Sequence, residues 1–203
     1  MLFRSIFSQL NKNYNLNLTL SDNPLDYVPE INWEYYQIDL ADKFVEKVKT
    51  PINLFCNGNV KSRQSGLDNM RTIVEYLCKK FPDEAFVCTQ KFDSAVKNLY
   101  FTDDIFPYEN DINEIAYLST KCKMIVGKNS GPFMFTHVKE NINNPNKAFV
   151  AFSGSVSDCY THHMHDLPCK YFFSKSTHPE VVCNVILGAM RSLNGSIINL
   201  SEI

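Results

Sequence analysis

The chain lacks the features that mark several large classes of protein. No apolar run approaches the roughly 20 residues needed to cross a bilayer. The apolar stretch within residues 1–14 is also too short for a signal peptide. Lysine and arginine (20) nearly balance aspartate and glutamate (22), so the overall charge does not indicate binding to nucleic acid or to an anionic membrane. We therefore expect a cytoplasmic protein with no transmembrane segment and no nucleic-acid partner.

Cysteine is not scarce, but the close spacing typical of metal and redox sites is missing. The chain has seven cysteines, no CxxC pair, and most of the cysteines lie inside apolar runs. They are Cys56, Cys78, Cys88, Cys122, Cys159, Cys169 and Cys183. The odd number and the apolar neighbours predict reduced, buried thiols rather than a disulfide framework.

Two common nucleotide-binding motifs are also missing. No G-x-G-x-x-G follows a predicted strand, which argues against a Rossmann dehydrogenase. The first long polar loop, residues 57–66, does not have the Walker spacing G-x-x-x-x-G-K-[ST]. A nucleotide site in this chain must therefore be built in another way.

The chain changes character near residue 50. Residues 1–50 begin with an amphipathic helix over 1–14 and continue as an irregular wrapping segment without a clean period. From residue 51 onward, apolar runs alternate with helical patterns, which predicts a regular domain over 51–203. The predicted strands are 52–56, 85–89, 98–102, 123–127, 147–152 and 169–173, and the predicted helices are 67–81, 111–122, 131–138 and 179–193.

The predicted strands are continuously apolar rather than alternating, and helices separate most of them. Such strands are typical of a sheet that is covered on both faces. The sequence therefore predicts an α/β fold with a doubly wound, Rossmann-like, mostly parallel sheet. Ligands of these folds bind beyond the carboxyl ends of the strands, where a loop leads into the next helix.

The first such loop follows the predicted strand 52–56 and reads NGNVKSRQSG, residues 57–66. It is longer than the two to six residues that usually connect a strand to a helix. Lys61 and Arg63 offer positive charge for a diphosphate, and Asn57, Gly58 and Ser62 offer polar or open backbone positions. The alternative is a solvated turn with two surface cations.

The second loop lies in KMIVGKNSGPFMF, residues 123–135. Lys128, Asn129, Ser130 and Gly131 connect an apolar strand to a helix that has Pro132 in its first turn. Gly131 would let a ligand approach the backbone, and the unpaired N–H groups of a helix start bind phosphate readily. The alternative is that Ser130 simply caps the helix.

The order of these segments resembles the C-terminal, nucleotide-sugar-binding domain of GT-B glycosyltransferases, and heptosyltransferase-like enzymes most of all. The resemblance covers NLFCNGNVKSRQS, FVCTQKF, YFTDDIF and DINEIAYLSTKCKMIVGKNSGPFMF, roughly residues 52–152. GKNSGP is similar to the family's phosphate-binding loop, with Asn129 where aspartate is more common. The resemblance implies one half of a GT-B fold, with diphosphate contacts at Ser130 and Gly131 and further contacts at Lys61, Ser62 and Arg63.

By position, the resemblance also implies a loop that holds the base and the ribose. This loop comprises Thr102, Asp103, Asp104 and Ile105, which follow a predicted strand. A turn explains the two aspartates equally well. The spacing of Asp111 and Glu114 predicts a capping box at the next helix, although Glu114 could equally face the ribose.

A histidine-rich segment, DCYTHHMHDLPC, occupies residues 158–169. Its His162, His163, His165 and Asp166 could supply zinc ligands, but their spacing fits none of the common zinc frames. We expect instead a polar loop near the ligand edge of the sheet, either plain surface or in contact with sugar or acceptor. No metal site is predicted, and the resemblance also implies metal-independent transfer.

The leading hypothesis is a glycosyltransferase-like domain that binds a nucleotide-diphosphate sugar as donor substrate and needs no other cofactor. Transfer requires a general base, which GT-B enzymes usually take from an N-terminal domain that residues 1–50 are too short to form. The candidate bases are therefore His162, His163, His165 and Asp166, or a group from a second chain or second copy. The alternative is a non-catalytic nucleotide or sugar-nucleotide binding protein that acts through a partner chain.

Overall fold

The structure is a computed structural model, and it describes residues 2–17, 19, 21, 23–58, 70–107, 111–128, 130–153 and 166–195. The described residues form one sheet of six parallel strands in the order β3-β2-β1-β4-β5-β6. The strands are β1 (Ile52–Cys56), β2 (Ala85–Cys88), β3 (Leu99–Phe101), β4 (Met124–Lys128), β5 (Ala148–Phe152) and β6 (Lys170–Ser174). This is the strand order of Rossmann-type doubly wound sheets, so the predicted fold class is confirmed.

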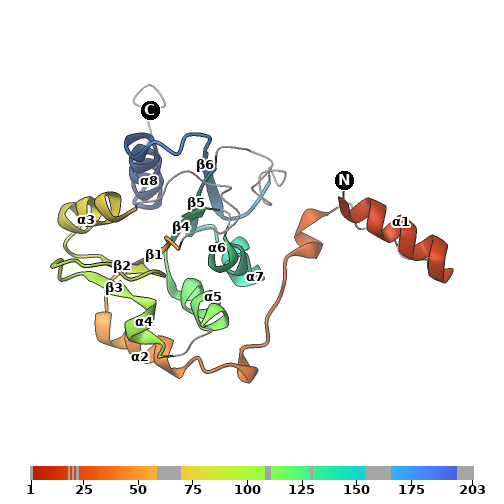
Figure 1. The fold of residues 1–203 in the computed structure, drawn as a ribbon, viewed down its shortest axis with the longest axis horizontal. Coiled ribbons are helices and arrows are strands. Elements are labelled where there is room, and N and C mark those ends of the chain that lie inside the picture. The colour runs from red at the N-terminus through yellow and green to blue at the C-terminus, as the bar shows by residue number, and fades with distance from the viewer. Residues whose placement is uncertain are drawn as a thin grey trace.

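Helices cover both faces of this sheet (Figure 1). One face packs against α3 (Arg71–Lys80) and α8 (Pro179–Leu193). The other face packs against α2 (Asp39–Val48), α5 (Ile112–Lys121), α6 (Gly131–Phe135) and α7 (Lys139–Ile142). The central strands are therefore buried on both sides, which is why their sequences are continuously apolar.

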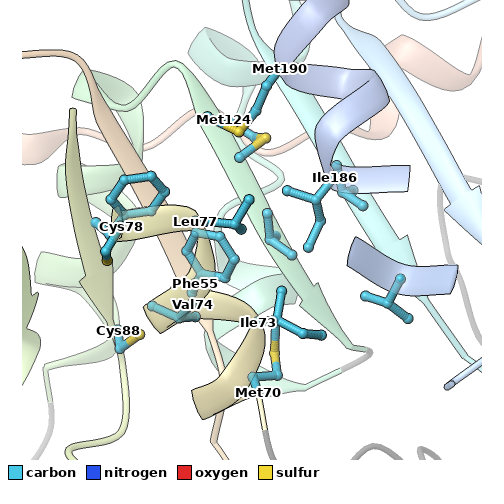
Figure 2. Packing of buried hydrophobic residues seen from close by; sticks show 14 of the residues in the cluster. Phe55, Met70, Ile73, Val74, Leu77, Cys78, Cys88, Met124, Ile186 and Met190 are labelled. Carbon is cyan, nitrogen blue, oxygen red and sulfur yellow. The ribbon is translucent and has the colours of Figure 1, made fainter. Parts of the chain in front are cut away.

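Successive side chains of a strand serve the two faces in turn. Phe55 and Met124 lie in the cluster with α3 and α8, where they meet Leu77 and Ile186 (Figure 2). Leu54 belongs to the cluster on the opposite face. Because every residue of β1, β4 and β5 is buried, these strands fix the position of their carboxyl ends firmly.

Several predicted boundaries are wrong. Thr102 does not continue β3 but begins the short helix α4 (Thr102–Ile105). The predicted helix 131–138 already ends at Phe135 as α6, and a separate short helix, α7, follows from Lys139. In the segment predicted to be irregular, α2 buries Ala41 and Phe44. The apolar spacing of α2 is helical, but it follows a stretch that has only short 3₁₀ turns, η1 (Pro24–Tyr27) and η2 (Trp33–Tyr35).

The second face also holds a buried cation. The Lys147 ammonium donates to the carbonyl oxygens of Ser119 (2.6 Å) and Thr120 (3.0 Å), and also to Asn141 Oδ1. These two carbonyls lie in the last turn of α5, whose acceptors have no partner within the helix. Burial lowers the pKa of Lys147 to about 8. This side chain therefore ties α5 to α7 and to the start of β5.

The cysteine prediction is confirmed for the described part of the chain. Cys56, Cys78, Cys88, Cys122 and Cys169 are free and buried, and Cys183 is free and partly buried. Burial raises the pKa of Cys122 to about 12 and that of Cys169 to about 11. These thiols pack as small apolar side chains.

Among the described helices, none is both long and apolar enough to span a bilayer.

Candidate functional site

The direction of winding reverses between β1 and β4. These two strands are hydrogen-bonded neighbours, with Cys56 opposite Gly127 at their carboxyl ends. The chain leaves β1 toward β2 on one side and leaves β4 toward β5 on the other side. In doubly wound sheets this reversal opens the crevice where ligands bind. We call the described residues at and just beyond these two strand ends, Asn57, Gly58, Lys128, Ser130 and Gly131, the switch-point site.

At the β4 end, two glycines have different roles. A Cβ on Gly127 would lie 2.5 Å from Cδ2 of Phe133, which is too close for any side chain. Gly127 is therefore needed so that α6 can pack directly on β4. A Cβ on Gly131 would meet only Cδ1 of Ile112, at an ordinary 3.5 Å. Packing does not require glycine at position 131, so glycine there leaves open space beside the backbone.

Ser130 occupies the N-cap position of α6 but does not act as a cap. Its backbone is extended (φ −135°, ψ 161°), and its side chain makes no capping hydrogen bond. The Ser130 Oγ is buried and has no hydrogen-bond partner among the described residues. The capping alternative is therefore wrong for the side chain. A buried hydroxyl without a partner costs roughly 1–3 kcal/mol, and an oxygen of a bound ligand would relieve that cost.

Lys128 adds a cation to the same strand end. The sequence pattern placed it in the connecting loop, but it is the last residue of β4 and lies opposite Phe152 of β5. Only 2% of its surface is exposed. Buried charges require compensating partners, so a lysine here is an unusual way to end an apolar strand. The sequence prediction did not name Lys128 as a binding residue, and a lysine at the end of an apolar run was the signal that could have identified it.

At the β1 end, the polar side chain is already used within the fold. Asn57 donates from Nδ2 to the Gln90 carbonyl oxygen (2.9 Å) and accepts at Oδ1 from the Gln90 amide (2.8 Å). These bonds tie the end of β1 to the end of β2. A Cβ on Gly58 would meet nothing within 4 Å. Lys61, Ser62 and Arg63 lie outside the described residues, so their diphosphate contacts stay predictions.

The predicted base and ribose loop is the helix α4 and is not a loop. Thr102 is fully buried, and its hydroxyl donates to the Thr89 carbonyl oxygen (3.4 Å). Asp104 forms an ion pair with Lys91, and both side chains are 54% exposed. Three strand spacings separate β3 from β4, a distance of about 14 Å. Asp103 and Ile105 lie in the same short helix, three strands from Ser130, and their contacts with base or ribose stay predictions.

The first turn of α5 lies closer to the β4 end. Ile112 is the nearest neighbour of Gly131, as the 3.5 Å distance to a Cβ on Gly131 shows. The capping box predicted for this turn is absent, because the Asp111 side chain makes no capping hydrogen bond. Glu114 is 8% exposed, and its Oε2 has no hydrogen-bond partner among the described residues. Sequence spacing explained Asp111 by capping and so missed it as a site residue, whereas Glu114 was predicted either to cap the helix or to face the ribose.

Burial also perturbs the first of these carboxylates. Desolvation is the main cause, and it raises the pKa of Asp111 above its ordinary value. The Asp111 backbone amide and the nearby Thr102 hydroxyl oppose this shift, while the charges of Asp103 and Glu114 add to it. Asp103, Asp111 and Glu114 therefore place negative charge near the start of α5.

The histidine-rich segment falls largely outside the described residues, as does Asn129. His162, His163 and His165 belong to this part, so their roles stay predictions. Asp166 is exposed and lies just before β6, whose amino end is held by a bond from the Cys169 amide to the Ile142 carbonyl oxygen (2.9 Å). Because β6 is parallel to β4, Asp166 lies toward the opposite edge of the sheet, roughly 16 Å from the carboxyl ends. Its expected place near the ligand edge is therefore wrong.

Metal-binding and sequence comparisons give no independent assignment. Within the described ranges, no group of three or more histidine, cysteine or acidic residues is placed to hold a metal ion. No protein-family model matches the chain, and no curated protein matches its sequence significantly. The fold and the geometry of the switch-point site are therefore the features from which a function can be inferred.

Proposed function

We propose that this chain binds the diphosphate of a nucleotide-diphosphate sugar at the switch-point site, as the nucleotide-binding half of a GT-B-like glycosyltransferase. The observation that carries the proposal is the buried Ser130 Oγ, which has no hydrogen-bond partner among the described residues, directly before Gly131 at the carboxyl end of β4. A phosphate oxygen is the natural acceptor for this hydroxyl, and Gly131 leaves room for it.

The surroundings of Ser130 support an anionic ligand on one side. Lys128 supplies a cation from the strand itself. The Gly131 amide lies at the start of α6, where backbone N–H groups have no partner within the helix. The predicted contacts of Lys61 and Arg63 would add charge from the first loop. Together these groups would offset the charge of a diphosphate leaving group.

The other side of the site supports the nucleoside. Asp111 and Glu114 lie in a partly dehydrated turn next to Gly131. Carboxylate oxygens are acceptors for ribose hydroxyls, and the free lone pairs of Glu114 Oε2 suit this role. We therefore assign ribose binding to the first turn of α5 in place of Asp103 and Asp104.

In sugar transfer, the acceptor oxygen would bond to the anomeric carbon while the bond from that carbon to the diphosphate breaks. A general base takes the acceptor proton, and the site residues offset the charge that develops on the leaving diphosphate. Asp166 lies too far away to be this base. His162, His163, His165 or a group from a second chain would supply it.

The distant position of Asp166 also favours the second candidate function, a non-catalytic sugar-nucleotide binding protein. Turnover distinguishes the two functions. Incubation with nucleotide-diphosphate sugars, with and without saccharide acceptors, should release nucleoside diphosphate if the chain is a transferase. Diphosphate binding without any release would favour the non-catalytic function.

Isothermal titration calorimetry tests the binding site itself. Uridine, guanosine and adenosine diphosphates should each be compared with the corresponding nucleoside. Charge-assisted hydrogen bonds contribute about 1.5–3 kcal/mol each, so the preferred diphosphate should bind at least tenfold more tightly than its nucleoside. Equal affinity for the two would contradict the proposal.

Ser130→Ala provides the matched variant for this titration. It should weaken diphosphate binding and leave nucleoside binding unchanged, because only the diphosphate reaches Ser130. The control is Ser176→Ala, whose hydroxyl accepts a hydrogen bond from the His178 amide (3.0 Å) beyond β6, two strands away from β4. A similar loss of affinity in both variants would mean that Ser130 has no special contact with the ligand.

A further inference from the structure

The N-terminal helix α1 (Leu2–Tyr14) lies apart from the rest of the molecule (Figure 1). None of the main packing contacts between helices and strands involves α1. Its last residue, Tyr14, is 69% exposed, and Leu16 beyond it is 42% exposed. Asn15 has a left-handed backbone (φ 51°), and the Leu16 amide donates to the Asn11 carbonyl oxygen (3.3 Å), so the helix has a defined end.

A helix of this length needs a surface to stabilise it. Its 13 residues are near the lower limit, about 12–15 residues, at which isolated helices are marginal in water. Among the described elements, none of the main packing contacts covers α1.

The sequence of α1 divides cleanly around the helix axis. At 3.6 residues per turn, its apolar positions fall within an arc of about 140°. These positions are Leu2, Phe3, Ile6, Phe7, Leu10 and Tyr14. The only polar residue in that arc is Asn13, and both cations, Arg4 and Lys12, fall on the opposite side.

The charge of this region differs from that of the rest of the chain. Residues 1–20 contain Arg4 and Lys12 and no acidic residue. The remaining 18 basic residues are outnumbered by all 22 acidic residues of the chain. The near-zero net charge of the chain is therefore the sum of a positive N-terminal region and a negative remainder. By net charge, an anionic surface attracts the N-terminal region and repels the rest of the chain.

We propose that α1 lies in the headgroup region of an anionic lipid membrane and anchors the protein there. Apolar aromatic and aliphatic residues on one face, cations on the other and low overall hydrophobicity are the pattern of interfacial helices. At about 20 Å, the helix is too short to cross a hydrocarbon core of about 30 Å. It therefore binds parallel to the membrane plane and leaves the switch-point site in water.

The body of the protein offers α1 a poorer surface. A groove of about 410 Å³ lies between α3 and α8, where Tyr76, Glu180 and Leu187 contribute to its lining. Its volume suits a small molecule, whereas the apolar face of α1 extends for about 20 Å. Pairing with α1 of a second copy would cover the apolar face but would leave the cations of both helices without an opposite charge. Lipid is the surface that matches both the shape and the charge.

Cosedimentation of the full chain with vesicles tests the inference. Vesicles of equimolar phosphatidylcholine and phosphatidylglycerol should bind the protein, and vesicles of phosphatidylcholine alone should bind it at least fivefold more weakly. Arg4→Gln and Lys12→Gln should each weaken binding to the anionic vesicles about fivefold. Phe7→Asp should abolish binding, and the polar-face control Ser8→Asn should leave it unchanged.

Light scattering over a range of protein concentrations separates the alternatives. The inference predicts the same mass for the native chain and Phe7→Asp. A native dimer that Phe7→Asp dissociates, with no binding to either vesicle, would overturn the inference in favour of pairing between two copies. Equal binding to both vesicle types would overturn the role of charge. Neither outcome affects the nucleotide proposal, because α1 is not part of the switch-point site.

Discussion

The carboxyl ends of β1 and β4 lie side by side, but the protein uses them differently. At the β1 end, the Asn57 side-chain amide forms two hydrogen bonds with the Gln90 backbone and so holds two strand ends together. At the β4 end, Ser130 keeps a buried hydroxyl without a partner among the described residues, and Gly131 keeps open space. The Asn57 side chain is therefore satisfied within the fold, whereas the Ser130 hydroxyl is the group that we propose a ligand satisfies.

The largest effect on stability is expected at Gly127, which allows α6 to pack on β4. Gly127→Val would place a side chain within 2.5 Å of the Phe133 ring and push α6 away from the strand. Overpacking of this kind should lower the free energy of unfolding by about 3 kcal/mol. Urea denaturation measures this loss of unfolding free energy. The control is Gly131→Val, which should lower the free energy of unfolding by less than about 1 kcal/mol. Similar losses at both glycines would remove the distinction between packing and ligand space.

The β4 end should also respond to acid in a way that the β1 end does not. His137 follows α6, and its Nδ1 lies 2.9 Å from the Phe133 carbonyl oxygen. Burial lowers the pKa of His137 to about 4 from 6.5. Between these values the unfolded chain binds a proton that the folded chain does not, so stability falls as the pH is lowered from 6.5 to 4.

His137→Phe should remove this contribution, which is up to about 3 kcal/mol at pH 4. The measurement is the free energy of unfolding of both proteins at several pH values from 4 to 7. The exposed His178 provides the control, and His178→Gln should keep the native pH dependence. If the free energy of unfolding of His137→Phe depended on pH as it does in the native protein, His137 would already be protonated in the folded protein.

A smaller effect is expected at Asn57. Asn57→Ala removes both hydrogen bonds to Gln90 and should lower the free energy of unfolding by about 1–2 kcal/mol. Ser130→Ala should cost less than about 0.5 kcal/mol, because no hydrogen bond is lost. Thermal denaturation of the two variants compares the strand ends directly. A larger loss for Ser130→Ala would show that its hydroxyl has a structural partner.

Much of the sheet could be predicted from sequence, because strands buried on both faces are continuously apolar. The bounds of β1 and α8 match their predictions, and β2 and β5 each differ by one residue. The failures concern short elements. The start of α6 at Gly131 was predicted, but tertiary contacts rather than periodicity decide where α6 ends and where α4 begins and ends.

The site could be predicted less well than the sheet. Its location followed from the rule for doubly wound sheets, and Ser130 and Gly131 lie where expected. The hydrogen bonds of Asn57 join it to a residue 33 positions away, which local sequence does not reveal. The proximity of Ile112 to Gly131 is likewise a tertiary contact. For this reason the acidic turn at Asp111 was interpreted as a cap.

The most direct test of the central claim is the diphosphate affinity of Gly131→Val. Valine should fill the space beside the backbone at the β4 end without disturbing the fold. Calorimetry should show more than a tenfold loss of diphosphate affinity, about 1.4 kcal/mol or more, with little change for the nucleoside. Phe135→Val, at a 47% exposed position in the same helix, should bind like the native protein. A folded Gly131→Val protein with full diphosphate affinity would contradict the claim that this strand end binds the ligand.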